Sequence, residues 1–296
     1  ETEDFISDKN QEFTYKSQGK DITESFYDLC KRNELPKSWL PKLVNECKSN
    51  GIEFLSTPTT LSGIKELNDL GINIMKNGSD YLTNTPLISD MAKNSEAVII
   101  STGMAFEEDV DYAIEAVIES NPNCTPILLH CTSLYPTPIG EVNMSRINTL
   151  SSRYNVMVGY SDHTEGFMAA LQSVALGAVI IEKHFTLDHM LEGPDHWFSI
   201  DPSELSLFCK EISDAKARMG SRAIAPSIDE SAIALDQRLS AVSCSNLKKG
   251  SKLRIENVVF KKPGTGIHPG KIVQYFGRKV NQNISIGDIL KKETFE

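Results

Sequence analysis

Short apolar runs alternate with longer amphipathic stretches between residues 39 and 219. The runs are rich in Ile, Val and Leu, which is typical of strands covered on both faces. They predict strands at Ile52–Leu55, Ile72–Met75, Ala97–Ile100, Pro126–Leu129, Asn155–Tyr160 and Ala178–Ile181. The amphipathic stretches predict helices at Trp39–Ser49, Thr60–Leu70, Pro86–Lys93, Phe106–Ser120, Asn143–Arg153, Gly166–Leu176 and Pro202–Met219. This alternation predicts an α/β fold around a parallel sheet.

Polar residues follow every predicted strand. An open doubly wound sheet concentrates its site at one switch point, whereas polar chemistry at all the strand ends favours a closed barrel with its site on the carboxyl rim. A (β/α)₈ barrel needs eight units, the pattern shows six, and the segment Glu1–Leu35 contains no strand-like run. We therefore expect a (β/α)₈ TIM barrel lacking its first two βα units in this chain, with those units preceding residue 1.

The pattern changes after Gly220. Residues 221–237 form a polar connection without strong periodicity, and residues 238–296 read as short strands and turns, including Leu239–Cys244 and Val258–Phe260. The sequence thus predicts a barrel domain over residues 1–220, a linker over 221–237 and a small β module over 238–296.

Composition narrows the class of protein. With 40% hydrophobic and 24% charged residues, the chain of 296 residues has ordinary globular composition. Its net charge of −10 argues against nucleic-acid binding, and no apolar stretch is long enough for a membrane span. The cysteines show no C-x-x-C spacing, so we expect reduced thiols and a cytoplasmic protein. They are Cys30, Cys47, Cys124, Cys131, Cys209 and Cys244.

Two histidines stand at the ends of consecutive predicted strands, His163 and His184. Imidazoles at neighbouring strand ends suit a divalent ion such as Mn²⁺ or Fe²⁺, with substrate or water completing the shell. The alternative is a pair of rim histidines satisfied by hydrogen bonds. Glu182 shares a side of its strand with His184, so it either orients a ligand or pairs with a barrel lysine.

Lysine and hydroxyl groups at the other strand ends suggest an anion site. Lys76 and Ser79 can cradle a phosphate or carboxylate, with Ser133 and Ser161 adding donors; the alternative for Lys76 is a surface lysine. Tyr135 and Asp195 are equally compatible with contacts to a polyhydroxylated substrate and with packing or turn roles. The chain has no G-x-G-x-x-G, P-loop, nucleophile elbow or H-E-x-x-H motif.

Four segments together resemble the sialic acid synthases, the N-acetylneuraminate synthase family. They are Leu129–Pro136, Gly159–Thr164, Ile181–Asp188 and Gly193–His196. In addition, Lys261–Ile267 and Gly277–Lys279 look like that family's C-terminal antifreeze-like (SAF) module, a β-clip domain.

The resemblance implies condensation of phosphoenolpyruvate with an N-acetylated hexosamine, such as N-acetylmannosamine, to a nonulosonic acid and phosphate. His163 and His184 would bind Mn²⁺, and Tyr135 and Asp195 would contact the acceptor sugar. Lys262 would reach into the partner's barrel in a homodimer. Phosphoenolpyruvate would be held by Lys76, Ser79, Ser133 and Ser161, with Lys76 and Glu182 as catalytic residues.

The chain departs from the family pattern in several places. Motifs of the E-I-G-x-N-H and K-x-Q types are absent, Asn77 replaces an apolar residue, and Lys262 replaces an arginine. Alternative functions are a legionaminate or pseudaminate synthase, a barrel aldolase or another phosphoenolpyruvate-dependent synthase acting on a sugar phosphate, and a non-catalytic truncated sugar-binding homologue.

Overall fold

The computed structural model describes residues 2–295 and divides into two compact units, Glu1–Gly220 and Ser221–Glu296. Glu1 and Glu296, the outer bounds of the predicted domains, lie outside the described residues. Within the described chain, no helix is both long and apolar enough to span a bilayer.

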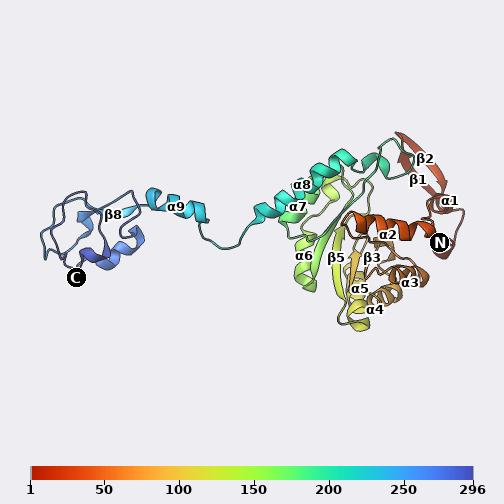
Figure 1. The fold of residues 1–296 in the computed structure, drawn as a ribbon, viewed down its shortest axis with the longest axis horizontal. Helices are drawn as coiled ribbons and strands as arrows, with labels where there is room; N and C mark the ends of the chain where they lie inside the picture. Colours follow the sequence, from red (N-terminus) through yellow and green to blue (C-terminus); the bar gives the residue numbers. More distant parts are fainter. Residues whose placement is uncertain (1, 296) are drawn as a thin grey trace. The chain divides into compact units, whose positions relative to one another are not determined.

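The first unit is built on a five-stranded sheet in which every neighbouring pair is parallel and the order follows the sequence (Figure 1). This sequential parallel order is the one expected for part of a (β/α) barrel. The predicted alternation of strands and helices is confirmed. The strands are β3 (Ile74–Asn77), β4 (Ala97–Ser101), β5 (Thr125–Cys131), β6 (Met157–Asp162) and β7 (Ile181–Lys183).

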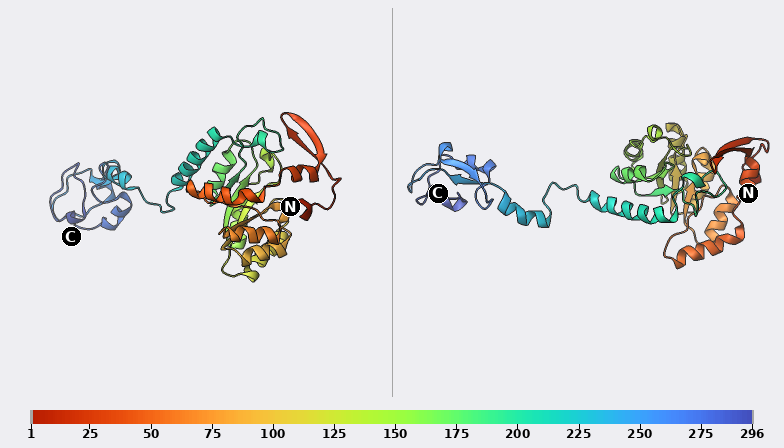
Figure 2. Two further views of the ribbon diagram at one scale, coloured as in Figure 1. Left: turned by 45° about the vertical axis from the view of Figure 1, so that its right-hand side comes forward. Right: turned by 90° about the horizontal axis from the view of Figure 1, so that it is seen from above.

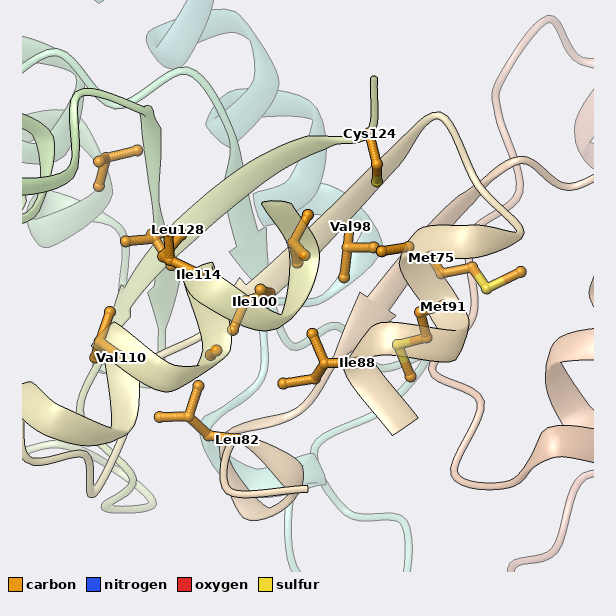
Figure 3. Packing of buried hydrophobic residues seen from close by; sticks show 14 of the residues in the cluster. Met75, Leu82, Ile88, Met91, Val98, Ile100, Val110, Ile114, Cys124 and Leu128 are labelled. Carbon is orange, nitrogen blue, oxygen red and sulfur yellow. The ribbon is translucent and has the colours of Figure 1, made fainter. Parts of the chain in front are cut away.

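Helices cover the outer face of this sheet, as two further views show (Figure 2). Alternate strand residues such as Val98, Ile100 and Leu128 point outward and pack against Ile88 and Ile114 of the helices (Figure 3). The helices of this unit that follow α1 (Phe26–Arg32) are α2 (Leu40–Ser49), α3 (Leu61–Asp69), α4 (Thr85–Lys93), α5 (Glu107–Ser120), α6 (Arg146–Tyr154), α7 (Met168–Ala175) and α8 (Pro202–Met219). Among them, α2 has no buried residue and takes no part in this packing. Burying this apolar face is the main stabilising contribution to the unit.

The inner face of the sheet carries a smaller apolar layer that includes Ile99, Ile127 and Leu129. Gly159 lies beside Leu129 in the register. A Cβ at Gly159 would stand 2.5 Å from both the Ile180 carbonyl oxygen and Leu129 Cδ2. Glycine is therefore required here because neighbouring strands approach too closely for a side chain.

Two predicted strands differ in the structure. Ile52–Leu55 forms no strand; one backbone bond near it, from Lys76 N to Ser56 O at 3.3 Å, does not make a ladder. The last strand lies further along the chain than Ala178–Ile181, at Ile181–Lys183. Val179 N still donates to Val158 O at 2.9 Å, so the predicted run is an extended approach to β7.

The expectation that residues 1–35 contain no strand is wrong. They form the antiparallel hairpin β1 (Glu12–Ser17) and β2 (Lys20–Ser25), followed by α1 (Phe26–Arg32). Gln18 and Gly19 make the two-residue turn with φ of 50° and 74°, the left-handed backbone typical of a tight hairpin. The strands are mostly polar and exposed, so no apolar run reveals them.

The second unit contains a helix that the sequence did not reveal. α9 (Ile228–Gln237) occupies the segment expected to be an aperiodic linker, and Ser227 caps it by accepting a bond from Glu230 N at 3.1 Å. β8 (Ser240–Ser243) pairs with β9 (Val258–Lys261) in antiparallel register. The core of the unit includes the fully buried side chains of Leu253, Val280 and Leu290.

Short 3₁₀ turns complete the described elements. They lie at Thr2–Asp4, Lys37–Trp39, Ser79–Tyr81, Ile139–Glu141, His196–Phe198, Ile255–Asn257, Pro269–Tyr275 and Lys292–Thr294.

Candidate active site

A buried lysine pairs with a carboxylate at the carboxyl ends of the strands. Lys76 on β3 is 9% exposed, and its Nζ lies 2.8 Å from Ser101 Oγ on β4 and 3.4 Å from Glu182 Oε2 on β7. Ser161 on β6 donates to Glu182 Oε1 at 2.7 Å. The inner face of the sheet thus holds a positive charge among hydroxyl groups, which is the chemistry of an anion site.

The imidazoles of His163 and His184 meet beside this group. Their ring centroids are 5.2 Å apart at an interplanar angle of 72°. His163 Nδ1 lies 2.9 Å from Thr132 O, and because a carbonyl can only accept, Nδ1 carries the proton and Nε2 is left for a ligand. Asp195 Oδ2 lies 3.6 Å from His184 Nδ1.

The pKa values of the two rings shift in opposite directions. Burial lowers the pKa of His184 and outweighs the nearby Asp195 carboxylate, so this ring is neutral and able to bind a metal. Burial also disfavours a charge on His163, but the Cys131 thiol and the Thr132 carbonyl outweigh it and raise the pKa of His163. A cation bound there would compete with a proton for the ring.

Aromatic rings enclose the imidazoles. The Tyr135 ring centroid is 4.2 Å from that of His163 and 5.9 Å from that of His184. Phe198 stands 5.3 Å from His184. Burial raises the pKa of Tyr135 to about 12, so its hydroxyl stays protonated and can donate to a ligand. These rings make the surroundings of His163 and His184 less polar than those of Lys76.

Hydroxyl groups of Ser79 and Ser133 gather around Gly103. Gly103 N donates to Ser79 Oγ at 3.0 Å, and a Cβ at Gly103 would lie 2.2 Å from Ser133 Oγ. Ser133 Oγ is buried and lacks a hydrogen-bond partner within the described chain. An unsatisfied buried hydroxyl costs free energy, and a bound anion would satisfy it.

A charged pair supports the site from the outer side of the sheet. Lys183 Nζ lies 3.0 Å from Asp162 Oδ2, and both side chains are at most 4% exposed. Asp162 Oδ1 also accepts bonds from Thr164 N at 2.8 Å and Thr164 Oγ1 at 2.7 Å. Asp162 and Lys183 are partners in the β6–β7 register, so they hold together the strand ends from which His163 and His184 emerge.

The structure therefore brings together the predicted site residues of the first unit, and it adds one that sequence reasoning passed over. Cys131 Sγ lies 3.8 Å from His163 Nδ1. Burial raises the pKa of this thiol, but His163 together with the hydroxyls of Ser79 and Ser161 lowers it overall. Its place at the end of β5 was the available signal. Lys262 belongs to the second unit, where its Nζ donates to Gln237 Oε1.

Two groups of side chains could hold a metal ion. His163 and His184 offer imidazole nitrogens next to the Asp195 carboxylate, a donor set suited to Mn²⁺ or Fe²⁺. His189, Asp201 and Glu204 are the second group, and among the described residues they are the set whose ligand atoms all lie within 4.8 Å of one another. However, Asp201 and Glu204 form the capping box of α8, where the helix dipole disfavours a cation. The His163–His184 pair is the better fit.

Comparison with known proteins shows similarity over most of the chain. Residues 1–223 match the model of the NeuB family. An uncharacterised protein of Methanocaldococcus jannaschii is 39% identical over 289 residues, which cover 98% of this chain and 81% of that protein. N,N'-diacetyllegionaminic acid synthase of Campylobacter jejuni is 34% identical, covering 97% of this chain and 86% of the enzyme. The crystal structure of N-acetylneuraminic acid (sialic acid) synthetase from Leptospira borgpetersenii superposes with a TM-score of 0.66 and 33% identity, over 70% of this chain and 72% of that one.

Proposed function

Because the chain belongs to the NeuB family, we propose that it condenses phosphoenolpyruvate with an N-acetylated hexosamine to give a nonulosonic acid and phosphate. The observation that carries the proposal is the buried Lys76, paired with the partly exposed Glu182, beside the His163–His184 pair. An anion-binding site next to a cation-binding site at the carboxyl ends of the strands suits a reaction between an anionic enol and a polarised aldehyde.

Phosphoenolpyruvate binds on the lysine side of the site. Lys76 supplies the positive charge, and the hydroxyls of Ser79, Ser133 and Ser161 supply donors to the phosphate and carboxylate oxygens. The unpartnered Ser133 Oγ gains the hydrogen bond that it otherwise lacks. Fixing the enol here places its C3 toward the imidazoles and reduces the entropic cost of the bimolecular step.

The acceptor sugar binds on the histidine side. His163 and His184 hold a divalent ion, most suitably Mn²⁺, which when bound supplies Lewis-acid polarisation of the aldehyde oxygen. Tyr135 donates a hydrogen bond to the open-chain sugar, and Asp195 accepts from its hydroxyls. The aromatic rings around His184 limit access of water to the reacting aldehyde.

The bonds change as follows. Enol C3 attacks the aldehyde carbon, so that a C–C bond forms, C2 becomes oxocarbenium-like and the aldehyde oxygen becomes an alkoxide. Water then adds to C2, and cleavage of the C2–O bond to phosphate releases inorganic phosphate and leaves the 2-keto acid. One proton of the water that adds to C2 converts the alkoxide to a hydroxyl, and the other leaves with the phosphate. Glu182 lies 3.4 Å from Lys76, where its carboxylate can take a proton of this water and Lys76 can stabilise the departing phosphate.

The remaining proposals concern architecture. We infer that residues 1–220 are part of a (β/α)₈ barrel and that residues 238–296 are an SAF-type β-clip module. We also propose that the protein is a cytoplasmic homodimer in which Lys262, next to Pro263 and Gly264, enters the barrel of the second subunit. Light scattering of the active full-length protein tests this: a strictly monomeric active enzyme would contradict it.

Phosphate release tests the reaction. Full-length protein with Mn²⁺ and phosphoenolpyruvate is given N-acetylmannosamine, a diacetamido trideoxyhexose or a pseudaminic precursor, so that sialate, legionaminate and pseudaminate chemistry are separated. We expect one of them to release phosphate stoichiometrically with nonulosonic acid. His163→Ala and His184→Ala should abolish metal-dependent release and weaken Mn²⁺ binding in calorimetry. Binding of sugar without any phosphate release would favour the non-catalytic homologue instead.

A further inference from the structure

A cavity lies on the outer side of the sheet, between α5 and α6. Its volume is about 310 Å³, at the lower end of the roughly 300–1,000 Å³ usual for small-molecule sites. The loop before α5, the end of β5 and one side of α6 line it. β4 and β5 are interior strands of the sheet, so this α5–α6 cavity lies away from the free sheet edges. It shares no lining residue with the candidate active site.

A buried histidine gives the cavity a hydrogen-bond acceptor. His130 on β5 lines it and is 1% exposed, and its Nε2 lies 2.6 Å from Val142 O. Because a carbonyl can only accept, Nε2 carries the proton. Burial lowers the pKa of His130 and outweighs the Val142 carbonyl, so the ring is neutral and Nδ1 is unprotonated. Nδ1 has no partner in the described part of the chain, so a ligand with an N–H or O–H would satisfy it.

Apolar side chains form a second part of the wall. Val110 of α5 and Leu150 of α6 line the cavity. Phe106, in the loop before α5, lines it as well and is 77% exposed. An exposed aromatic ring beside aliphatic side chains favours a flat, apolar ligand body, because aromatic rings pack well face to edge or offset.

The charges around the cavity leave one cation unpaired. Two arginines of α6 line it, Arg146 and Arg153. Arg153 is neutralised by Glu107 at 2.8 Å and Asp111 at 3.0 Å, whereas Arg146 forms no ion pair within residues 2–295. A carboxylate on the ligand would complement Arg146, since a guanidinium can bind both carboxylate oxygens at once.

We propose that the α5–α6 cavity is a regulatory site for a small aromatic carboxylate that carries a hydrogen-bond donor opposite its carboxylate. The donor bonds to His130 Nδ1, the ring packs against Leu150 and Phe106, and the carboxylate pairs with Arg146. The binding itself goes beyond the proposed function and does not depend on it.

Thr102 connects this cavity to the proposed anion site, and this part of the inference rests on the proposed function. Thr102 lines the cavity, and it follows Ser101, whose hydroxyl contacts Lys76 Nζ at 2.8 Å. It precedes Gly103, whose N donates to Ser79 Oγ at 3.0 Å. A ligand that contacts Thr102 thus acts on the backbone between two contacts of the anion site, and its binding should be coupled to that of phosphoenolpyruvate.

Three related compounds test the chemistry of the cavity. 4-Hydroxyphenylacetate has both the donor and the carboxylate, phenylacetate lacks the donor, and 2-(4-hydroxyphenyl)ethanol lacks the charge. An NMR titration that observes each compound gives its Kd for the unaltered full-length protein, with saturating phosphoenolpyruvate and no metal ion so that the anion site is occupied. We expect 4-hydroxyphenylacetate to bind with a Kd of about 1 mM or tighter and each of the other two to bind at least about fivefold more weakly. Equal Kd values for all three compounds would overturn the proposal.

A surface substitution tests the location. Arg146→Gln should weaken 4-hydroxyphenylacetate about fivefold or more and change the Kd of the uncharged alcohol less than about twofold. Arg222→Gln is the matched control, since Arg222 is an exposed arginine of the second unit and its loss changes the net charge equally. It should alter neither Kd. Unweakened binding of 4-hydroxyphenylacetate to Arg146→Gln would place the compound elsewhere and overturn the proposal.

Phosphate release tests the coupling separately. With 4-hydroxyphenylacetate at about ten times its Kd, the KM for phosphoenolpyruvate should change by more than about twofold in the wild type and by less in Arg146→Gln. A constant KM refutes the regulatory role of the cavity. Absence of phosphate release with every hexose refutes the proposed function, and the Kd values then decide on the cavity alone.

Discussion

Neutralising Asp162 should destabilise the first unit while leaving its shape almost unchanged. In Asp162→Asn, the side-chain oxygen can still accept the two Thr164 bonds, so the change removes mainly the charge. Lys183 is 4% exposed and would lose its carboxylate partner. Leaving a buried charge unpaired costs about 3–5 kcal/mol, a large part of the roughly 5–15 kcal/mol stability of a typical domain.

Urea denaturation followed by tryptophan fluorescence measures this loss. The chain contains two tryptophans, Trp39 and Trp197, and both lie in the first unit, so the signal reports that unit. The double variant Asp162→Asn/Lys183→Met removes both charges, and its loss should fall short of the sum of the single losses by about 1–3 kcal/mol. A loss below about 1 kcal/mol in Asp162→Asn, or strictly additive losses, would refute the reasoning.

Three further outcomes are expected. Gly103→Ala should raise the KM for phosphoenolpyruvate about tenfold or more in the phosphate-release assay, because the added Cβ would lie 2.2 Å from Ser133 Oγ. An unchanged KM for phosphoenolpyruvate would contradict the proposal that the hydroxyl cluster binds this substrate. Leu128→Ala should cost about 2–5 kcal/mol in urea denaturation, since Leu128 is fully buried; a smaller loss would mean that the core collapses around the gap. The Arg32 guanidinium and the Tyr15 hydroxyl lower the pKa of Glu24 to about 2. A carboxylate with a lowered pKa stabilises the fold above its unfolded pKa near 4.5, and this stabilisation is lost as pH falls toward 2. The melting-temperature difference between the wild type and Glu24→Gln should therefore shrink between about pH 5 and pH 2. A constant difference would refute the role of the ion pair.

Periodicity predicted the part of the fold that depends on continuous burial. β4 and β5 lie close to the predicted runs because both of their faces are covered, and an apolar run is the direct consequence of that environment. The hairpin β1–β2 gave no such signal, since its residues are mostly exposed. α9 was equally hidden: no residue of it is buried, so its helix rests on a capping box that a search for apolar periodicity does not detect.

Site residues could be predicted where reactive side chains lie at the carboxyl end of a strand. Glu182 and His184 could be placed on one side of their strand because strand residues alternate. The approach of α1 to the strand ends could not be predicted, since this helix lies far from His184 in sequence. Contacts of the preceding hairpin, such as the bonds from Gly193 N to Ser17 Oγ and from Gln18 Nε2 to Met190 O, bring that helix to the rim. No local pattern encodes contacts of such separation.

The close packing around Gly159 also limits how far a substrate can extend between the strands from their carboxyl ends. Gly159 stands two residues before Ser161 on the inner face of β6, and Leu129 and Ile180 close in on it from both sides. Together they make a floor one side-chain layer below the lysine, hydroxyl and imidazole groups. A molecule that enters from the strand ends therefore cannot pass below the reactive groups. The packing beneath the site keeps both substrates at the level of these groups.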